Sequence, residues 1–455
     1  AWRYEWGMAD RLLSKENELT GTVMRYDYDR FDFLIRQETT KGSATDVIYR
    51  VPDFVGNLYG TPERKDRRYG AGGRLLEDAE CICHYDDEGN LVFREFRQPR
   101  EDAVRHDRRR MEREYGIRRP VTDMGWIYEW TSGGMLRRVV RPDGKPVEFR
   151  YDALGRRTAK QYLGKVTRWV WDGNTPLHEW VAAATDNDGR EDISCPDGNS
   201  LTTWVFEEGT FVPAAKIRGD RQCSIVSDYL GTPVQMYDSE GNKIWDCTLD
   251  IYGKVADFRG ESLHDCPFRF QGQYEDIETG LYYNRFRYYD PSVGLYISQD
   301  PIGLQGSMQL YAYVHTPNSW IDSLGLKKYI VYQAPVLDAN GKPTGKVYTG
   351  RTSGADDMTR QQILNRRKSN HHRKDIGQLV AIFETNNYKT VRGAEHYYIE
   401  EARKTGEAAD QIAGISDRNF GKNGKKLKGD EYMEAFFKEK SDLKQPKSSE
   451  LSIYH

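Results

Sequence analysis

The residues from Arg285 to Leu326 read RFRYYDPSVGLYISQDPIGLQGSMQLYAYVHTPNSWIDSLGL, and they separate two regions that differ in composition and charge. Two aspartates in this stretch, Asp300 and Asp322, lie 22 residues apart, and each is followed shortly by Gly-Leu. If the intervening segment folds back on itself, the two carboxyl groups meet. They then cannot both ionise cheaply, so one keeps its proton and the pair can activate water as acid and base. The alternative interpretation is that both aspartates only cap tight turns before glycine.

Charge is divided unevenly about this stretch. The chain of 455 residues has a formal net charge of −3, but residues 327–455 contain 24 Lys and Arg against 17 Asp and Glu, a net charge of +7. The remainder has 43 basic and 53 acidic residues and therefore carries −10. A basic domain suits an anionic polymer, and an acidic wall around it would hold it electrostatically. A solvated basic face is the plainer explanation of the same charge.

The length predicts two or three domains, and the frequent Tyr, Trp and Gly favour a β-rich body. Among the six cysteines, Cys81 and Cys83 are too close for a zinc knuckle and have no second pair, so we expect free buried thiols made in a reducing cytosol. No apolar run is long enough to span a membrane, and no signal peptide opens the sequence. The first residues, AWRYEWGMADRLL, look like the middle of a repeat, and we expect a piece of a longer chain.

Residues 1–284 repeat a loose unit: an aromatic residue, three residues, a glycine and the start of a strand. Examples are Tyr69 with Gly73, Tyr85 with Gly89, Trp130 with Gly134, Tyr151 with Gly155, and Tyr237 with Gly241. The glycine supplies the positive φ of a hairpin turn, and a neighbouring Asp or Asn stabilises that turn. Each unit is therefore predicted to be a β-hairpin, and the hairpins to stack into one sheet. A β-sandwich or propeller is the alternative. The segment DRRRMEREYGIRRP, residues 107–120, is charged and helix-like.

The stretch quoted first resembles the motif that closes the core of Rhs (rearrangement hot spot) proteins, and the repeats resemble their YD repeats and those of toxin-complex C subunits. The resemblance implies a β-rich shell, a spiralling antiparallel sheet, over residues 1–284, of which this length walls only a partial cocoon. It implies a core-terminal motif at 285–326 and a variable toxin domain at 327–455. It also implies self-cleavage between Leu326 and Lys327, with Asp300 and Asp322 as the aspartyl-type pair.

The basic region predicts a small α/β domain. Residues 328–354 read as two strands joined by a turn, 361–374 as a helix, 378–385 as a strand and 390–406 as an amphipathic helix that ends at Gly406. This order resembles the GIY-YIG nuclease fold, with Val331-Tyr332 and Val347-Tyr348-Thr349-Gly350 in the places of the two triplets. The resemblance implies the catalytic residues Tyr332, Tyr348, Arg367 or Arg366, His371 (with His372 as the near alternative), Glu395 and Asn419.

The chemistry of a phosphodiesterase explains these residue types. Glu395 would hold Mg²⁺ or Mn²⁺, an arginine would stabilise the phosphorane, and a tyrosine would orient or deprotonate water. Nonspecific contacts to nucleic acid would come from Arg351, Lys422, Lys425, Lys426 and Lys428. The plain alternatives are that the tyrosines only pack in strands, that Glu395 is the solvent edge of its helix, and that the lysines form a solvated tail.

Three functions follow from these expectations. The first is an interbacterial Rhs effector, whose caged nuclease hydrolyses DNA after release. For it the resemblance implies manufacture in the bacterial cytoplasm, secretion by a type VI machine with a VgrG/PAAR-type spike, action in the target-cell cytoplasm, a cognate immunity protein and a chaperone. The second is the same shell with another toxic enzyme, an RNase or an ADP-ribosyltransferase. The third is a repeat surface protein without catalysis.

Overall fold

The computed structural model describes residues 2–7, 11–30, 32–185, 196, 198–301, 309–314, 316–322, 328–354, 360–369, 371, 373–385, 388–409 and 428–439. Within these ranges the chain is built mainly from antiparallel strands that pair with their neighbours in the sequence. A sheet of five strands comes first, β1 to β5: Trp2–Trp6, Leu12–Asn17, Thr22–Tyr28, Leu34–Lys41 and Ala44–Tyr49. The short strands β6 (Val51–Pro52) and β7 (Leu58–Tyr59) follow as a pair.

The largest sheet has sixteen described strands in unbroken sequence order, β8 to β23, and we call it the wall. Its strands are Arg68–Tyr69, Leu75–Glu77, Cys81–Tyr85, Leu91–Phe96, Gly125–Trp130, Leu136–Val140, Pro146–Tyr151, Arg157–Tyr162, Lys165–Asp172, Thr175–Ala183, Thr202–Phe206, Pro213–Arg218, Arg221–Ser227, Pro233–Tyr237, Lys243–Leu249 and Val255–Arg259. The prediction of stacked antiparallel hairpins is therefore confirmed, but the expectation of one sheet over residues 1–284 is not, because β1–β5, β6–β7 and β24–β25 lie in sheets separate from the wall. The helix predicted near residues 107–120 is α1 (Arg108–Tyr115), and short 3₁₀ turns lie at Ala71–Gly73 and Leu263–Asp265.

Where the repeat contains an aspartate, as at Asp86, Asp152 and Asp238, this residue and the glycine close the hairpin in the same way. Oδ1 of Asp152 accepts hydrogen bonds from the backbone nitrogens of Leu154 and Arg156, both at 2.9 Å, while Gly155 has a φ of +74°. The register shifts between Arg150 and Tyr151, at the end of β14. A carboxylate that satisfies the turn and a glycine in the left-handed region explain why this unit recurs.

At four places the repeated aromatic residue ties a hairpin to the one before it. Its hydroxyl or indole N–H donates to the carbonyl of the residue two positions after the preceding repeat's glycine. The pairs are Tyr85 with Leu75 at 2.8 Å, Trp130 with Leu91 at 2.8 Å, Tyr151 with Leu136 at 2.7 Å, and Trp171 with Arg157 at 2.7 Å. The repeat therefore encodes contacts between hairpins as well as the hairpins themselves.

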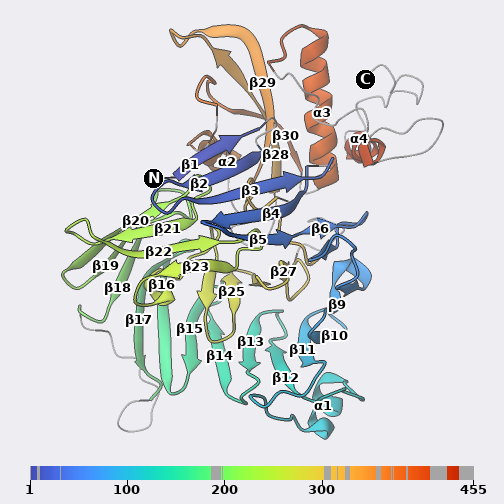
Figure 1. Cartoon of the computed structure of the whole chain (residues 1–455), viewed down its shortest axis with the longest axis vertical. Helices are drawn as coiled ribbons and strands as arrows, with labels where there is room; N and C mark the ends of the chain where they lie inside the picture. The colour runs from blue at the N-terminus through green and yellow to red at the C-terminus, as the bar shows by residue number, and fades with distance from the viewer. Residues whose placement is uncertain are drawn as a thin grey trace.

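The main core lies between one face of the wall and a sheet of four described strands, which we call the plug. The plug strands are β24 (Tyr274–Asp276), β25 (Leu281–Asn284), β26 (Arg287–Asp290) and β27 (Leu295–Tyr296). Six plug-region tyrosines are at most 2% exposed: Tyr282, Tyr283, Tyr288, Tyr289, Tyr296 and Tyr313. Because the wall curves around the plug (Figure 1), the face that contacts the plug is the inner face.

Residues 327–455, the basic region, are called the tail from here on. The tail contains β28 (Lys328–Leu337), β29 (Pro343–Gly354), α2 (Arg360–Ser369), β30 (Val380–Thr385), α3 (Tyr388–Lys404) and α4 (Lys428–Glu439). The predicted order of two strands, helix, strand and helix is what the structure has, whereas α4 was not predicted. The described strands form a sheet with the order β29-β28-β30. Figure 1 shows the tail at one end of the molecule, beside β1–β5 and away from α1. Among the described helices, none has the length and apolar character needed to cross a bilayer.

Candidate active sites

We call residues 1–326, which precede the tail, the shell. The last turns of the shell place Asp300 and Asp322 against one guanidinium group. A single nitrogen, Nη2 of Arg287, lies 3.2 Å from Oδ2 of Asp300 and 3.2 Å from Oδ2 of Asp322. The two carboxylate oxygens are therefore no farther apart than twice that distance. All three side chains are buried, with Asp322 and Arg287 at most 1% exposed. The fold thus sets two carboxylates against one cation just before the chain enters the tail.

Two further side chains hold Asp322 in place. The Tyr296 hydroxyl donates to Oδ2 of Asp322 at 2.9 Å. Nδ2 of Asn284 donates to the Tyr296 oxygen at 2.6 Å and to the Asp322 carbonyl at 2.8 Å. Burial raises the pKa of Tyr296 well above its ordinary value and the charge of Asp322 raises it further, so the phenol stays a donor. The guanidinium carbon of Arg287 lies 3.6 Å from the centre of the Tyr296 ring, a cation–π contact.

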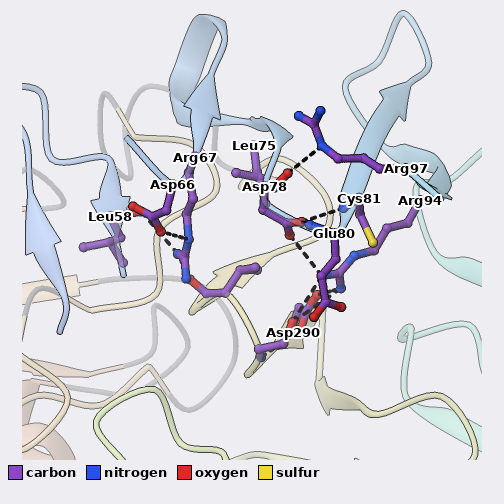
Figure 2. A network of polar contacts seen from close by, with 12 residues as sticks. Leu58, Asp66, Arg67, Leu75, Asp78, Glu80, Cys81, Arg94, Arg97 and Asp290 are labelled. Carbon is purple, nitrogen blue, oxygen red and sulfur yellow. Dashed lines mark hydrogen bonds and ion pairs between the residues drawn. The ribbon is translucent and has the colours of Figure 1, made fainter. Parts of the chain in front are cut away.

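The far end of β26 is anchored by two arginines, Arg94 of the wall and Arg67, the residue just before the wall begins (Figure 2). Nη1 of Arg94, on β11, lies 2.6 Å from Oδ2 of Asp290, the last residue of β26. Its Nη2 lies 3.3 Å from Oδ2 of Asp78. Nη1 of Arg67 donates to the carbonyl of Val293, in the same plug turn, at 2.8 Å. Contacts with the wall therefore set the position of β26, the strand that presents the shared guanidinium to the two aspartates.

One face of the tail sheet gathers Tyr332, Tyr348, Arg367 and His371, which we call the tyrosine cluster. Nε2 of His371 and the Tyr332 hydroxyl oxygen are 2.9 Å apart, and Nε of Arg367 donates to the same oxygen at 3.1 Å. The backbone N–H of Arg373 donates to Nδ1 of His371 at 3.0 Å, so the neutral ring carries its proton on Nε2, facing Tyr332. The Tyr348 ring is perpendicular to the His371 ring at 5.2 Å. Two donors converge on one phenol oxygen, which stabilises negative charge there.

Gly350, which ends the second triplet-like pattern, makes room for the phenol of Tyr332. The two residues lie opposite each other in β28 and β29. A Cβ atom at Gly350 would lie 2.7 Å from the Tyr332 hydroxyl oxygen, which is closer than real Cβ atoms approach. The pattern therefore needs a glycine at position 350, because a side chain there would collide with the phenol of Tyr332 in the cluster.

The tyrosine cluster is closed to a polymer in this arrangement. Tyr332 and His371 are at most 1% exposed and Tyr348 is 8% exposed. Phe211 and Phe286, both from the shell, pack against the hydrophobic side chains of the same sheet face. The shell therefore covers part of the face on which the tyrosine cluster lies.

Glu395 lies on the other face of the tail sheet. Val331 is opposite Arg351 in the β28–β29 register, one step from the Tyr332 and Gly350 pair, so the side chains of Arg351 and Tyr332 point to opposite faces. The Glu395 carboxylate, on α3, contacts the Arg351 guanidinium, and Nη1 of Arg392 lies 3.6 Å from its Oε2. Of the residues expected to form one nuclease site whose side chains the structure describes, Glu395 therefore lies apart from the tyrosine cluster.

The surroundings of Glu395 do not fit a magnesium or manganese ion. Such an ion needs several oxygen ligands and a net negative site, whereas here two guanidinium groups face the one carboxylate. Within the described part of the chain, no group of three or more His, Cys, Asp or Glu side chains is close enough to hold a metal. We therefore assign no step to a metal ion.

Several expected site residues fall outside the described residues. These are Leu326 and Lys327 at the expected cleavage site, His372, Asn419, Lys422, Lys425 and Lys426. Arg366 and Lys428 lie in α2 and α4, but their side chains also fall outside the description. Arg351, expected to contact nucleic acid, is instead directed at Glu395 and lies 5.3 Å from the centre of the Trp320 ring in the shell.

Sequence reasoning missed Arg287, Tyr296 and Asn284 around the aspartates. Arg287 and Tyr296 are in the stretch quoted first, where an arginine inside the aromatic run RFRYYD was the available signal. A charged residue among three aromatic neighbours is buried only with a partner. The signal shows that a partner exists, and only the fold shows that the partner is both aspartates.

Comparison with known proteins places this architecture in a family. The family model described as the teneurin YD-shell matches residues 15–309. Double-stranded DNA deaminase toxin A of Burkholderia cenocepacia (strain H111) is 30% identical over 380 residues, covering 78% of this chain and 25% of that protein. Probable deoxyribonuclease RhsA of Dickeya dadantii (strain 3937) is 31% identical over 299 residues, covering 64% and 19% respectively. Toxin protein Tse5 of Pseudomonas aeruginosa is 30% identical over 352 residues, covering 71% and 25%.

The family match covers well over half of the chain, including β3 to β5, the wall and the plug. The chain therefore belongs to the teneurin YD-shell family. It spans a quarter or less of the length of these three curated relatives. The match ends at residue 309, before Asp322 and the tail.

Proposed function

We propose that this chain is part of an Rhs-type toxin, in which a YD shell ends in a self-cleaving joint and a nuclease domain follows. The observation that carries the proposal is the contact of Asp300 and Asp322 with one nitrogen of Arg287, directly before the tail. The relatives named as toxins and as a probable deoxyribonuclease support the toxin class and the nuclease class.

The joint has the groups that peptide hydrolysis needs. With both carboxylates ionised, the buried trio with Arg287 carries one net negative charge, whereas it is neutral if one carboxyl keeps its proton. The neutral state costs less to bury. Tyr296 and Arg287 both donate to Asp322, so in the proposed step Asp322 acts as the base and Asp300 as the acid.

In the proposed step, Asp322 accepts a proton from water as the water oxygen attacks the carbonyl carbon of Leu326. The bond between that carbon and the nitrogen of Lys327 then breaks, and Asp300 gives its proton to the leaving nitrogen. Asn284 holds the carbonyl of Asp322 itself. Leu326 and Lys327 are four and five residues beyond Asp322.

For the tail we propose hydrolysis of DNA at the tyrosine cluster. Tyr332 would orient or deprotonate the attacking water, Arg367 would neutralise the phosphate, and His371 would exchange the proton. The two donors on the Tyr332 oxygen support this assignment. Because Phe211 and Phe286 pack against the same face, we propose that the tail must separate from the shell before a substrate reaches Tyr332.

Partners and route follow from the toxin class. We propose a cognate immunity protein, a secretion machine of type VI with a spike and chaperone, and action in the target-cell cytoplasm. A second candidate for the tail is another enzyme acting on DNA bases, which the relative named as a DNA deaminase favours.

The test expresses the whole chain and its variants in bacteria. Asp322→Asn is expected to abolish cleavage between Leu326 and Lys327, read by mass spectrometry, while Asp238→Asn, in an exposed wall turn, leaves it unchanged. Loss of plasmid DNA on induction is expected to disappear in Tyr332→Phe and to persist in Tyr329→Phe, a buried tyrosine on the other sheet face. Cleavage that survives Asp322→Asn overturns the joint. Intact plasmid with base changes moves the tail to the deaminase, and degraded RNA moves it to an RNase.

A further inference from the structure

Between β11 and β12 the chain leaves the wall for residues 97–124, which we call the arginine arm. Neighbouring strands of the wall are mostly joined by turns of a few residues. The arm is therefore an addition that the wall does not need in order to close a hairpin, and neither proposed site uses it.

The base of the arm is clasped onto the wall. The backbone nitrogen of His106 donates to the Asp123 carbonyl at 2.8 Å. The backbone nitrogen of Thr122 donates to Oε1 of Glu95, a fully buried carboxylate on β11, at 2.6 Å. Arg105 and Arg108 both pair with the Asp123 carboxylate, at 2.8 and 2.6 Å. Such a clasp fixes both limbs of the arm before any partner arrives.

The helix of the arm is capped at both ends and has its own small core. Oδ1 of Asp107 accepts from the backbone nitrogen of Arg109 at 2.8 Å, and Gly116 ends the helix in the left-handed region. Met111 and Ile117 pack with Phe93, Ile127 and Val140 of the wall. The helix is therefore held rigidly on the wall.

The arm lies on the outer face of the wall. Ile127 and Val140, which touch the arm, alternate along β12 and β13 with Tyr128 and Val139, which belong to the core shared with the plug. Successive residues of a strand point to opposite faces. The arm is thus on the side away from the plug, and Figure 1 shows α1 at the opposite end of the molecule from the tail.

The exposed side of the arm is rich in arginine. Residues 97–123 contain nine Arg, no Lys and six Asp or Glu, a net charge of +3 within an otherwise acidic region. Arg109 and Arg113 are four residues apart on the helix face opposite the buried Met111. The side chain of Arg113 is 73% exposed, and that of Arg118 is 82% exposed. The outward helix face therefore offers guanidinium groups that ion pairs with their neighbours leave largely in solvent.

The composition of the arm favours a protein over a nucleic acid or a membrane. Protein interfaces are rich in Arg and poor in Lys, and they combine charge with apolar area. Val104 and Val121, at the base of the arm, are 45% and 61% exposed. We propose that the arginine arm is a docking surface for a partner protein that presents carboxylates together with apolar side chains.

The test measures binding of the intact chain to three probes: an acidic peptide with leucine at every third position, a short DNA duplex and vesicles of anionic phospholipid. The peptide is expected to bind best. Arg109→Gln with Arg113→Gln is expected to weaken it about threefold to tenfold, as two exposed ion pairs would. Arg221→Gln with Lys254→Gln removes two exposed charges elsewhere on the wall and is expected to leave binding unchanged.

A second variant separates apolar contact from charge. Val121→Ser is expected to weaken binding of the peptide. It is expected to leave any binding of the duplex unchanged, since phosphate groups gain nothing from contact with an apolar side chain. Thermal unfolding of each variant serves as the control for folding. Stronger binding of the duplex or the vesicles than of the peptide would overturn the proposal. The proposal would also be overturned if the double variant of Arg109 and Arg113 and the control double variant lost peptide binding equally. Equal loss would show only a general attraction of the peptide to positive charge.

Discussion

Asp276 is the residue that fixes the plug to the wall. Its carboxylate is fully buried, with Nη1 of Arg157 2.5 Å from Oδ2 and Nζ of Lys160 3.1 Å from Oδ1. Burial by itself raises the pKa of Asp276, but the charges of Arg157 and Lys160 hold it below its ordinary value. The Arg157 guanidinium lies 4.5 Å from the ring centres of both Trp169 and Tyr283. A buried ion pair of this kind stabilises little by itself, yet removing one partner is costly.

At the residue scale we expect Asp276→Asn to lower the free energy of unfolding by about 3 kcal/mol at neutral pH. A carboxylate with a lowered pKa in the folded state contributes stability above its unfolded pKa, about 4, and loses it as the pH falls through the lower folded value. The difference between wild type and variant should therefore shrink below that pH. Urea unfolding across pH measures this, with Glu278→Gln, whose carboxylate pairs with Lys160, as the milder control. A difference that does not change with pH would contradict the ion-pair account.

At the scale of the element, the aromatic residue of several repeats acts between hairpins. The Tyr151 hydroxyl, at the end of β14, donates to the Leu136 carbonyl of the previous hairpin and lies 2.9 Å from the Tyr288 hydroxyl of the plug. The strand pattern and the turn glycine account for a hairpin, but neither joins one hairpin to the next. The side-chain hydrogen bond adds that link and helps to make the wall continuous.

We expect Tyr151→Phe to lower the free energy of unfolding by about 1 kcal/mol, because it leaves the Leu136 carbonyl without this donor. Tyr237→Phe is the matched control, since the Tyr237 hydroxyl bonds only Gln235 on its own strand. Urea unfolding followed by tryptophan fluorescence measures both. Equal losses of unfolding free energy in the two variants would show that the hydrogen bond between hairpins stabilises the fold no more than one within a strand.

At the scale of the whole molecule, the tail is docked on the shell through charge and aromatic contact. Nη2 of Arg392, on α3, lies 3.2 Å from Oδ2 of Asp32, in the turn between β3 and β4. The rings of Trp320 and Tyr329 meet edge to face at 5.8 Å across the same boundary. The expected attraction between the acidic part of the chain and the basic domain is thus seen in one contact. In it the buried Arg392 of the tail pairs with Asp32 of the shell.

We expect Asp32→Asn to increase hydrogen exchange in α3 by several-fold, because it removes the shell carboxylate from Arg392 while asparagine tolerates the positive φ of this turn. Asp27→Asn, which removes an exposed carboxylate from the neighbouring strand, should leave exchange in α3 unchanged. Mass spectrometry of exchanged peptides from residues 388–404 measures the effect. Unchanged exchange in the Asp32 variant would indicate that apolar packing alone holds the tail.

Much of the fold was predictable because it is local. Aspartate, glycine and an aromatic residue at fixed spacing determine a turn, a bulge and a hairpin, and consecutive hairpins pair in order, so the antiparallel wall follows from the sequence. The order of the first five tail elements was equally readable from strand and helix patterns. The helix α4 was missed because its apolar residues, Met433, Phe436 and Phe437, follow a lysine-rich stretch that reads as a solvated tail.

The candidate sites were predictable only in part, because they depend on which sheet face a side chain occupies. The sequence by itself determined the two aspartates, the tyrosines of the two strands and the arginine–histidine spacing of the following helix. Only the tertiary structure decided that both aspartates share Arg287, and that Glu395 faces two arginines across the sheet from Tyr332. The physical reason is that spacing along a chain sets local geometry, whereas contacts between distant segments depend on the register and packing of the whole fold.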